Sequence, residues 1–129
     1  MARKITDLTP EEIEFLTERH HGTLTTLRAD GSPHVVAIAF VLDHGDGIVR
    51  IISSDESQKV KNVERSRRAA ICQVEGRRWL TLEGDARVER DSDHVRRAET
   101  AFEARYRPPR PNPSRVAIEV TVDRILGTA

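Results

Sequence analysis

The stretch "GTLTTLRADGSPHVVAIAFVLD", residues 22–43, decides the fold class because it indicates a β-hairpin. Its first arm, residues 22–28, has a period of two, and Asp30-Gly31 is a common turn signal between two strands. The second arm, residues 33–43, is apolar on both faces, which is typical of a strand at the centre of a sheet. We therefore expect its second face to meet another subunit or the wall of a closed barrel.

Three short helices are predicted from their start signals. Thr9 suits an N-cap, Glu12 closes a capping box with it, and Gly22 is placed to end this first helix. A second helix follows the strand-like run at residues 48–53, and a third helix ends near Tyr106. The expected N-caps of these two helices are Ser54 or Ser57, and Asp91 or Ser92.

Four further strands are expected, and they indicate a mainly β protein with short helices. The final strand alternates cleanly, with the valines and the isoleucine of "VAIEVTV", residues 116–122, expected inside. The proline-rich residues 107–114 predict an irregular connector, because proline fits neither a helix interior nor a central strand. Since nearly all links are hairpin-like, we expect one antiparallel barrel domain over residues 1–129. The four strands cover residues 48–53, 69–75, 78–90 and 115–126.

The composition excludes some classes of protein. The chain has 21 lysines and arginines and 21 aspartates and glutamates, so its net charge is zero. Generic nucleic-acid-binding domains usually have a strong basic excess. The single cysteine, Cys72, the absence of an apolar N-terminal segment and the absence of a membrane-length apolar run predict a reduced, cytoplasmic protein without a membrane partner.

The segment "SSDESQKVKNVERSRRAA", residues 53–70, predicts an anion site. A helix that begins after a strand presents free backbone N–H groups, which suit a phosphate. Lys59 and Asn62 are three residues apart and share a face, whereas Val60 and Val63 share the opposite, core-facing side. An ordinary solvated helix face is the competing interpretation.

Two further basic clusters have the same two interpretations. The segment "RYRPPRPNPSR", residues 105–115, puts arginines on a stiff loop, where they suit carboxylates or phosphates. A solubilising loop explains them equally well. In "GRRWL", residues 76–80, Trp79 suits either stacking on a flat ligand or a place in the core or an interface.

The sequence contains no recognisable catalytic motif. The histidines lack metal-ligand spacing, so no metal site is predicted, and there is no G-x-S-x-G, G-x-G-x-x-G or Walker pattern. An enzyme of this kind takes its chemistry from a cofactor. The catalytic residues and the proton donor are not identified by the sequence.

The order and spacing of four motifs resemble a known family. "ADGSPHVV", "SQKVKN", "RWLTLEG" and "RYRPPRPNP" are similar to the flavin/deazaflavin oxidoreductases with the split β-barrel of pyridoxamine 5′-phosphate oxidase. Within that superfamily they are most similar to the coenzyme F420-dependent branch and its biliverdin reductases. The resemblance covers residues 8–128.

The resemblance implies a homodimer with two cofactor sites at the subunit interface, and F420 as cofactor, with FMN as the alternative. The segment from His34 to Ile38 would line the deazaflavin ring, the β-strand end at residues 52–54 would lie beneath it, and the lysine helix would hold the phosphate. Arg78 and Trp79, from the other subunit, would close the ring pocket. The implied cofactor residues are His34, Val35, Val36, Ala37, Ile38, Ile52, Ser53, Ser54, Ser57, Gln58, Lys59, Lys61, Asn62, Arg78, Trp79, Arg110 and Asn112.

The implied activity is hydride transfer from reduced deazaflavin to a conjugated acceptor, with biliverdin, reduced to bilirubin, as the leading substrate. An FMN-dependent reductase with the same fold is one alternative. A non-catalytic deazaflavin or tetrapyrrole carrier is another. A nucleic-acid-binding module is disfavoured by the neutral charge and by the lack of an aromatic-studded sheet face.

Overall fold

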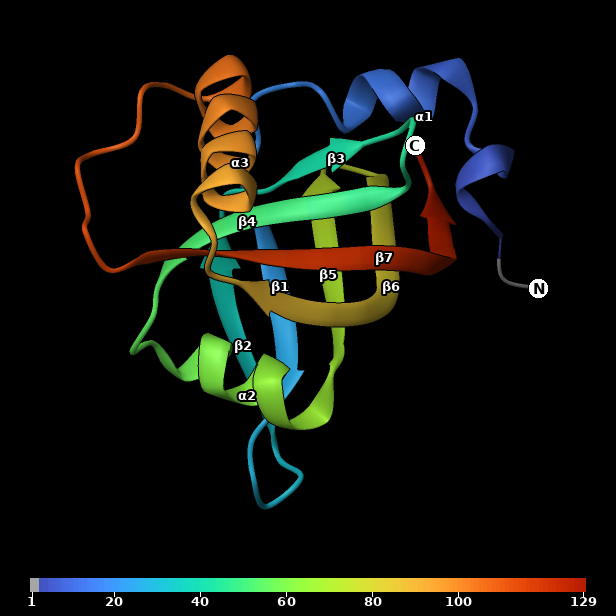
Figure 1. Cartoon of the computed structure of the whole chain (residues 1–129). Coiled ribbons are helices and arrows are strands. Elements are labelled where there is room, and N and C mark those ends of the chain that lie inside the picture. The colour runs from blue at the N-terminus through green and yellow to red at the C-terminus, as the bar shows by residue number, and fades with distance from the viewer. Residues whose placement is uncertain (1–2) are drawn as a thin grey trace.

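Seven strands form one antiparallel sheet in the order β2-β1-β5-β6-β7-β4-β3 in the computed structural model, which describes residues 3–129 (Figure 1). The predicted mainly β class and antiparallel pairing are thereby confirmed. The strands are β1 (Gly22–Leu27), β2 (Pro33–Ile38), β3 (Val41–Asp43), β4 (Ile48–Ser54), β5 (Arg68–Glu75), β6 (Arg78–Glu89) and β7 (Arg115–Thr128). The helices are the 3-10 turn η1 (Ile5–Asp7), α1 (Pro10–Phe15), α2 (Gln58–Ser66) and α3 (Ser92–Arg105).

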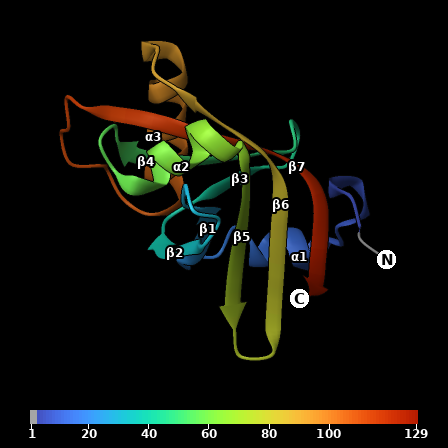
Figure 2. The same cartoon turned by 90° about the horizontal axis from the view of Figure 1, so that it is seen from below.

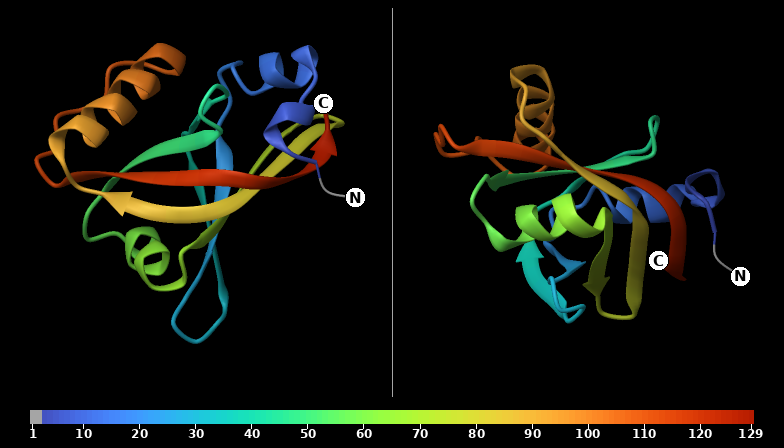
Figure 3. Two further views of the ribbon diagram at one scale, coloured as in Figure 1. Left: turned by 45° about the vertical axis from the view of Figure 1, so that its right-hand side comes forward. Right: turned by 60° about the horizontal axis from the view of Figure 1, so that its bottom comes forward.

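The chain connectivity forces the sheet to curl into a barrel. The edge strands β2 and β3 are consecutive in the chain, and only Ala39 and Phe40 separate them. Two linking residues span roughly 10 Å at most, so the two edges of the sheet have to come close together. Figure 3 shows the curled sheet in two views.

The predicted single strand over residues 33–43 is wrong, because the chain leaves the sheet at Ala39 and Phe40. The backbone of Phe40 forms hydrogen bonds with side chains at the C-terminal end of α3 and not with a neighbouring strand. Its amide donates to the Tyr106 hydroxyl at 3.3 Å, and its carbonyl accepts from the Arg105 guanidinium at 2.5 Å. The two halves of the predicted central strand therefore become the two edges of the sheet.

The helices cover different parts of this barrel. In Figure 1, α1 and α2 lie on opposite sides of the curled sheet, and α3 runs across the direction of β4 and β7 and packs against both. The fully buried Leu24, Ile71, Leu80, Leu82 and Ile118 fill the interior between the strands. Within residues 3–129, no helix is long and apolar enough to cross a membrane.

The first helix starts as predicted and ends earlier than predicted. The Thr9 hydroxyl accepts from the Glu12 amide at 3.1 Å, and the Glu12 carboxylate accepts from the Thr9 amide at 3.0 Å, which completes the capping box. The helix ends at Phe15, and Gly22 instead opens β1. A Cβ atom on Gly22 would lie 2.7 Å from the Cys72 carbonyl, so this glycine permits close packing of β1.

The last two elements also follow the prediction only in part. Asp91 caps α3 by accepting from the His94 amide, and residues 107–112 form the expected irregular connector. The clean alternation expected for β7 is wrong over residues 116–120, where every residue is buried. The cause is α3, which packs on β7 and covers the outer face on which Glu119 lies.

Candidate functional site

The N-terminus of α2 lies directly after the end of β4. Ser57 has the backbone conformation of an N-cap, but its hydroxyl is paired with the Ser53 hydroxyl at 2.9 Å and makes no capping bond. The first amides of α2 are therefore left without a side-chain cap. Uncapped amides and the positive end of the helix dipole favour an anion.

Lys59 stands in the first turn of this helix and is half-buried. Among the described residues, its ammonium has no ion-pair partner within 4.0 Å. Burial lowers the pKa of Lys59 below its ordinary value, because a desolvated ammonium is less stable. A phosphate at the mouth of α2 would supply the missing counter-charge.

The expectation that Asn62 shares an outward face with Lys59 is wrong, because Asn62 is fully buried. The side-chain Nδ2 of Asn62 donates to the Thr26 hydroxyl at 3.1 Å, and its side-chain Oδ1 accepts from Nε2 of Gln58 at 2.8 Å. Thr26 lies on β1, so the contact fastens α2 to the sheet. Asn62 thus holds the helix in place, while Gln58 and Lys61 are exposed.

The connector between α3 and β7 contacts the end of β4, next to the N-terminus of α2. Asn112 donates from Nδ2 to the Ser54 hydroxyl at 2.9 Å, so the structure brings these two predicted residues together. Arg110 is exposed two residues away, and its carbonyl accepts from Arg115 at 2.6 Å. The end of β4, the mouth of α2 and the connector therefore form one polar surface.

Two arginines of the predicted basic loop serve the fold instead. Arg105 donates to the carbonyls of Glu18 and Phe40 and to the side chain of Gln73. Arg115 is paired with Glu99 at 2.8 Å. Sequence patterns did not indicate these roles, because the hydrogen-bond and ion-pair partners are distant in the chain.

The β2 segment predicted to line a ring is an edge strand. Val35 is 56% exposed and faces outward, whereas Ile38 is buried. His34 is half-buried, and its Nδ1 atom is buried without a hydrogen-bond partner among the described residues. His34 is paired in register with Thr26, whose hydroxyl accepts the hydrogen bond from Asn62.

Arg78 and Trp79 lie at the start of β6, at the tip of the hairpin that extends from the barrel in Figure 2. Arg78 is paired with Glu18 at 3.2 Å, and Trp79 is 42% exposed. Arg78 is eight residue steps, roughly 26 Å along the strand, from Ala86, which lies beside α2. Within one chain, the structure therefore does not bring this pair to Lys59.

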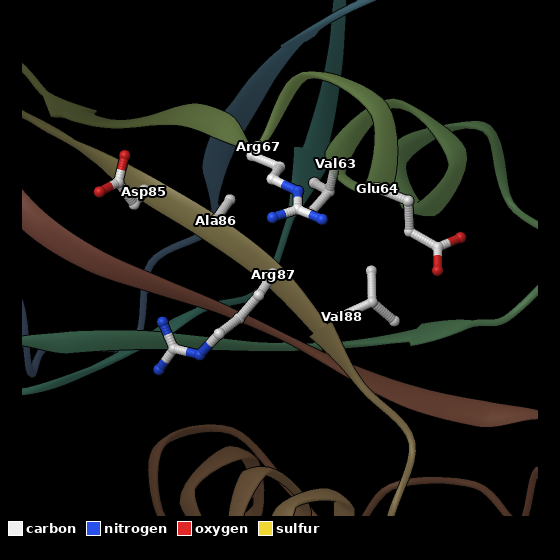
Figure 4. Close-up of a pocket in the computed structure, with 7 residues that line it drawn as sticks. All are labelled: Val63, Glu64, Arg67, Asp85, Ala86, Arg87 and Val88. Atoms are coloured by element: carbon white, nitrogen blue, oxygen red, sulfur yellow. The ribbon is translucent and has the colours of Figure 1, made fainter.

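A surface cavity of about 580 Å³ lies between the end of α2 and β6 (Figure 4). Sequence reasoning missed it, because its walls come from segments about twenty residues apart without a shared motif. Its charges are mixed, and none of its lining residues belongs to the predicted cofactor set. They are Val63, Glu64, Arg67, Asp85, Ala86, Arg87 and Val88.

Comparison with known proteins agrees with the fold. The family profile for pyridoxamine 5′-phosphate oxidase matches residues 8–129. A curated relative from Mycobacterium tuberculosis, named F420H(2)-dependent biliverdin reductase, is 52% identical over 129 residues, which are 100% of this chain and 94% of the relative.

Solved structures share the same architecture. A conserved hypothetical protein of Mycobacterium tuberculosis superposes with a TM-score of 0.80 at 22% identity, over 98% of this chain and 89% of the other. A structure named F420 reductase superposes with a TM-score of 0.70 at 22% identity, over 88% of this chain and 94% of the other. With the matching profile and the full-length relative, these comparisons lead to one assignment: the chain belongs to the pyridoxamine 5′-phosphate oxidase family.

Proposed function

We propose that this chain is a coenzyme F420-dependent oxidoreductase that transfers a hydride from the reduced deazaflavin to biliverdin and so forms bilirubin. The name of the 52% identical relative supports this activity, since the identity extends over the whole chain. The structural observation that carries the proposal is Lys59, a half-buried cation with no anionic partner among residues 3–129, at the start of α2, where Ser57 makes no side-chain cap.

The residues at this site fit a cofactor that carries a phosphate. Lys59 and the first amides of α2 would hold the phosphate, and Ser54, oriented by Asn112, lies beside them. The edge strand β2 and Ile52 of β4 would border the ring. The bound deazaflavin supplies the hydride, and the chain contributes orientation and exclusion of water.

The acceptor also suits the chemistry of this surface. Biliverdin is flat and carries two propionate carboxylates. Arg110 is exposed on the connector that Asn112 fastens to Ser54, and an arginine at this position suits a carboxylate.

A homodimer completes the proposed site. Residues that pair between neighbouring strands lie on the same face of a sheet. One row of such paired residues crosses β2, β1, β5, β6 and β7 on the outer face, and all of its members are uncharged. The large apolar side chains Leu27, Val35, Val74, Trp79 and Leu126 are exposed on the same face. A second copy covering this face would bury them and bring its own Arg78 and Trp79 to the neighbouring site. The uncharged row is Ala37, Thr23, Cys72, Thr81 and Leu126.

The test is a fluorescence titration of the full chain with oxidised F420, beside an identical titration with FMN, followed by turnover of biliverdin with reduced F420. Tight F420 binding, weak FMN binding and conversion to bilirubin are expected. Tight binding of FMN alone would replace the proposal with an FMN-dependent reductase. Binding of F420 without turnover would indicate a carrier.

A further inference from the structure

Three side chains with metal-ligating groups meet where β6 ends and α3 begins. Glu89 is the last residue of β6, His94 lies in the first turn of α3, and Glu119 lies in the middle of β7. One ligand atom from each lies within 4.8 Å of the others. The sequence predicted no metal site, because Glu119 is distant from the other two residues and no local spacing joins them.

Glu119 is a buried carboxylate, and one of its two oxygens accepts no hydrogen bond. It is 2% exposed, and its Oε1 atom accepts from Arg87 at 2.9 Å. Its Oε2 atom is buried without a hydrogen bond, and the Arg50 Nε atom is 3.7 Å away. A buried carboxylate oxygen normally has a hydrogen bond or an ion as its partner.

His94 presents one nitrogen to the same place. Both carboxylate oxygens of Asp91 lie close to His94 Nδ1, at 2.7 and 2.8 Å, so this nitrogen carries the shared proton. The other nitrogen, Nε2, is 3.3 Å from the Glu89 carboxylate. Two ligand atoms on one tetrahedral zinc ion lie roughly 3.4 Å apart, so this separation suits a common ion. A carboxylate behind a histidine is the usual second-sphere arrangement of zinc sites.

We propose that Glu89, His94 and Glu119 bind one divalent transition-metal ion of the zinc class, with Asp91 orienting His94. One nitrogen and two carboxylate oxygens are typical ligands of such an ion, and water would complete the coordination. His94 and Glu89 are partly exposed, which gives the ion a path from solvent. Arg87 and Arg50 offset part of the buried negative charge, which limits the affinity.

The bound ion would fasten α3 to the barrel. α3 carries Arg105 at its far end, and the connector after it carries Asn112 beside Ser54. The ion therefore links the position of the proposed cofactor surface to the anchoring of one helix. The competing arrangement is a protonated His94 held by the same carboxylates, with no ion.

The test is isothermal titration of the metal-free full chain with Zn²⁺ at pH 7.5. One ion per chain is expected. His94→Ala and Glu89→Gln should lower the affinity more than tenfold, and both keep the α3 cap because Asp91 bonds the backbone amide of residue 94. His44→Ala, on an exposed loop, is the matched control and should bind as the parent does.

Asp91→Asn separates the two arrangements most sharply. Asparagine caps a helix as well as aspartate does, so the stability of α3 should be kept. The loss of the carboxylate behind His94 should nevertheless weaken Zn²⁺ binding by about 10- to 100-fold. Absence of binding by the parent chain, or equal binding by the parent and His94→Ala, would overturn the proposal in favour of the protonated histidine.

Discussion

Replacing Lys59 by alanine should weaken the binding of F420 without destabilising the chain. A hydrogen bond to a charged group contributes about 1.5–3 kcal/mol. Loss of that contact raises the dissociation constant by about 10- to 150-fold. The matched control is Lys4→Ala, which removes the same charge at an exposed position outside the implied cofactor residues. The control should change the affinity less than threefold at 0.15 M salt.

The unfolding free energy provides an independent readout for the same variant. Among residues 3–129 no carboxylate is paired with Lys59, and folding lowers its pKa, so at pH 7 the folded state disfavours its charge. Urea unfolding of Lys59→Ala without cofactor should therefore show no loss of stability. Fluorescence titration at two salt concentrations measures the binding. Equal losses in both lysine variants would mean that general electrostatics, and not a phosphate contact, explains the effect.

Three further predictions concern the fold and the assembly. Arg105→Met should lower the unfolding free energy by about 3 kcal/mol in urea, since it leaves the buried Gln73 side-chain oxygen without a donor and removes the bonds to the Glu18 and Phe40 carbonyls. Glu12→Gln should cost about 2–3 kcal/mol at pH 7, because the pKa of Glu12, lowered to about 2 first of all by its bond to Arg3, lies below its unfolded value. That contribution is complete above about pH 5 and is lost as the pH falls toward 2, so the parent and Glu12→Gln should converge in urea unfolding near pH 2. Thr81→Glu should shift the chain from dimer to monomer in light scattering, because it places two like charges in the proposed interface.

Each of these predictions has a matched control. Arg110→Met changes an exposed arginine and should alter the stability by less than about 0.5 kcal/mol; an equal effect at Arg105 would show that its hydrogen bonds contribute little. A Glu12→Gln difference that stays constant between pH 7 and pH 2 would contradict the ion-pair argument. Glu11→Gln, on the exposed side of the same helix, is the control for that series. Thr121→Glu, exposed on another part of the sheet, should leave the dimer intact.

Structural features that depend on residues close together in the chain could be predicted from the sequence. Features that depend on contacts between distant residues could not. The Thr9–Glu12 capping box is a four-residue pattern, and it formed as expected. The break at Phe40 depends on Arg105 and Tyr106, which are more than sixty residues away. Asn62 has the helical spacing of a surface residue, and only its contact with Thr26 on β1 explains its burial.

The candidate site divides in the same way. The exposed start of the lysine helix after a strand is a local pattern, so Lys59 could be singled out from the sequence. The pairing of Asn112 with Ser54 joins segments fifty-eight residues apart. The family resemblance put each residue in the cofactor set, but neither the resemblance nor the spacing predicted their contact. Arg105 resembled a ligand-binding arginine because sequence patterns do not reveal backbone carbonyl partners.

The position of β7 determines when the barrel can be completed during synthesis. β7 is the last strand of the sheet to leave the ribosome, yet it lies between β6 and β4 and pairs with both. Until it emerges, β2-β1-β5-β6 and β4-β3 are two separate ladders, and the chain joins them only through Ala39 and Phe40 and through residues 55–67, which include α2. The nascent chain therefore exposes apolar strand faces until β7 emerges, and the barrel cannot close before that point.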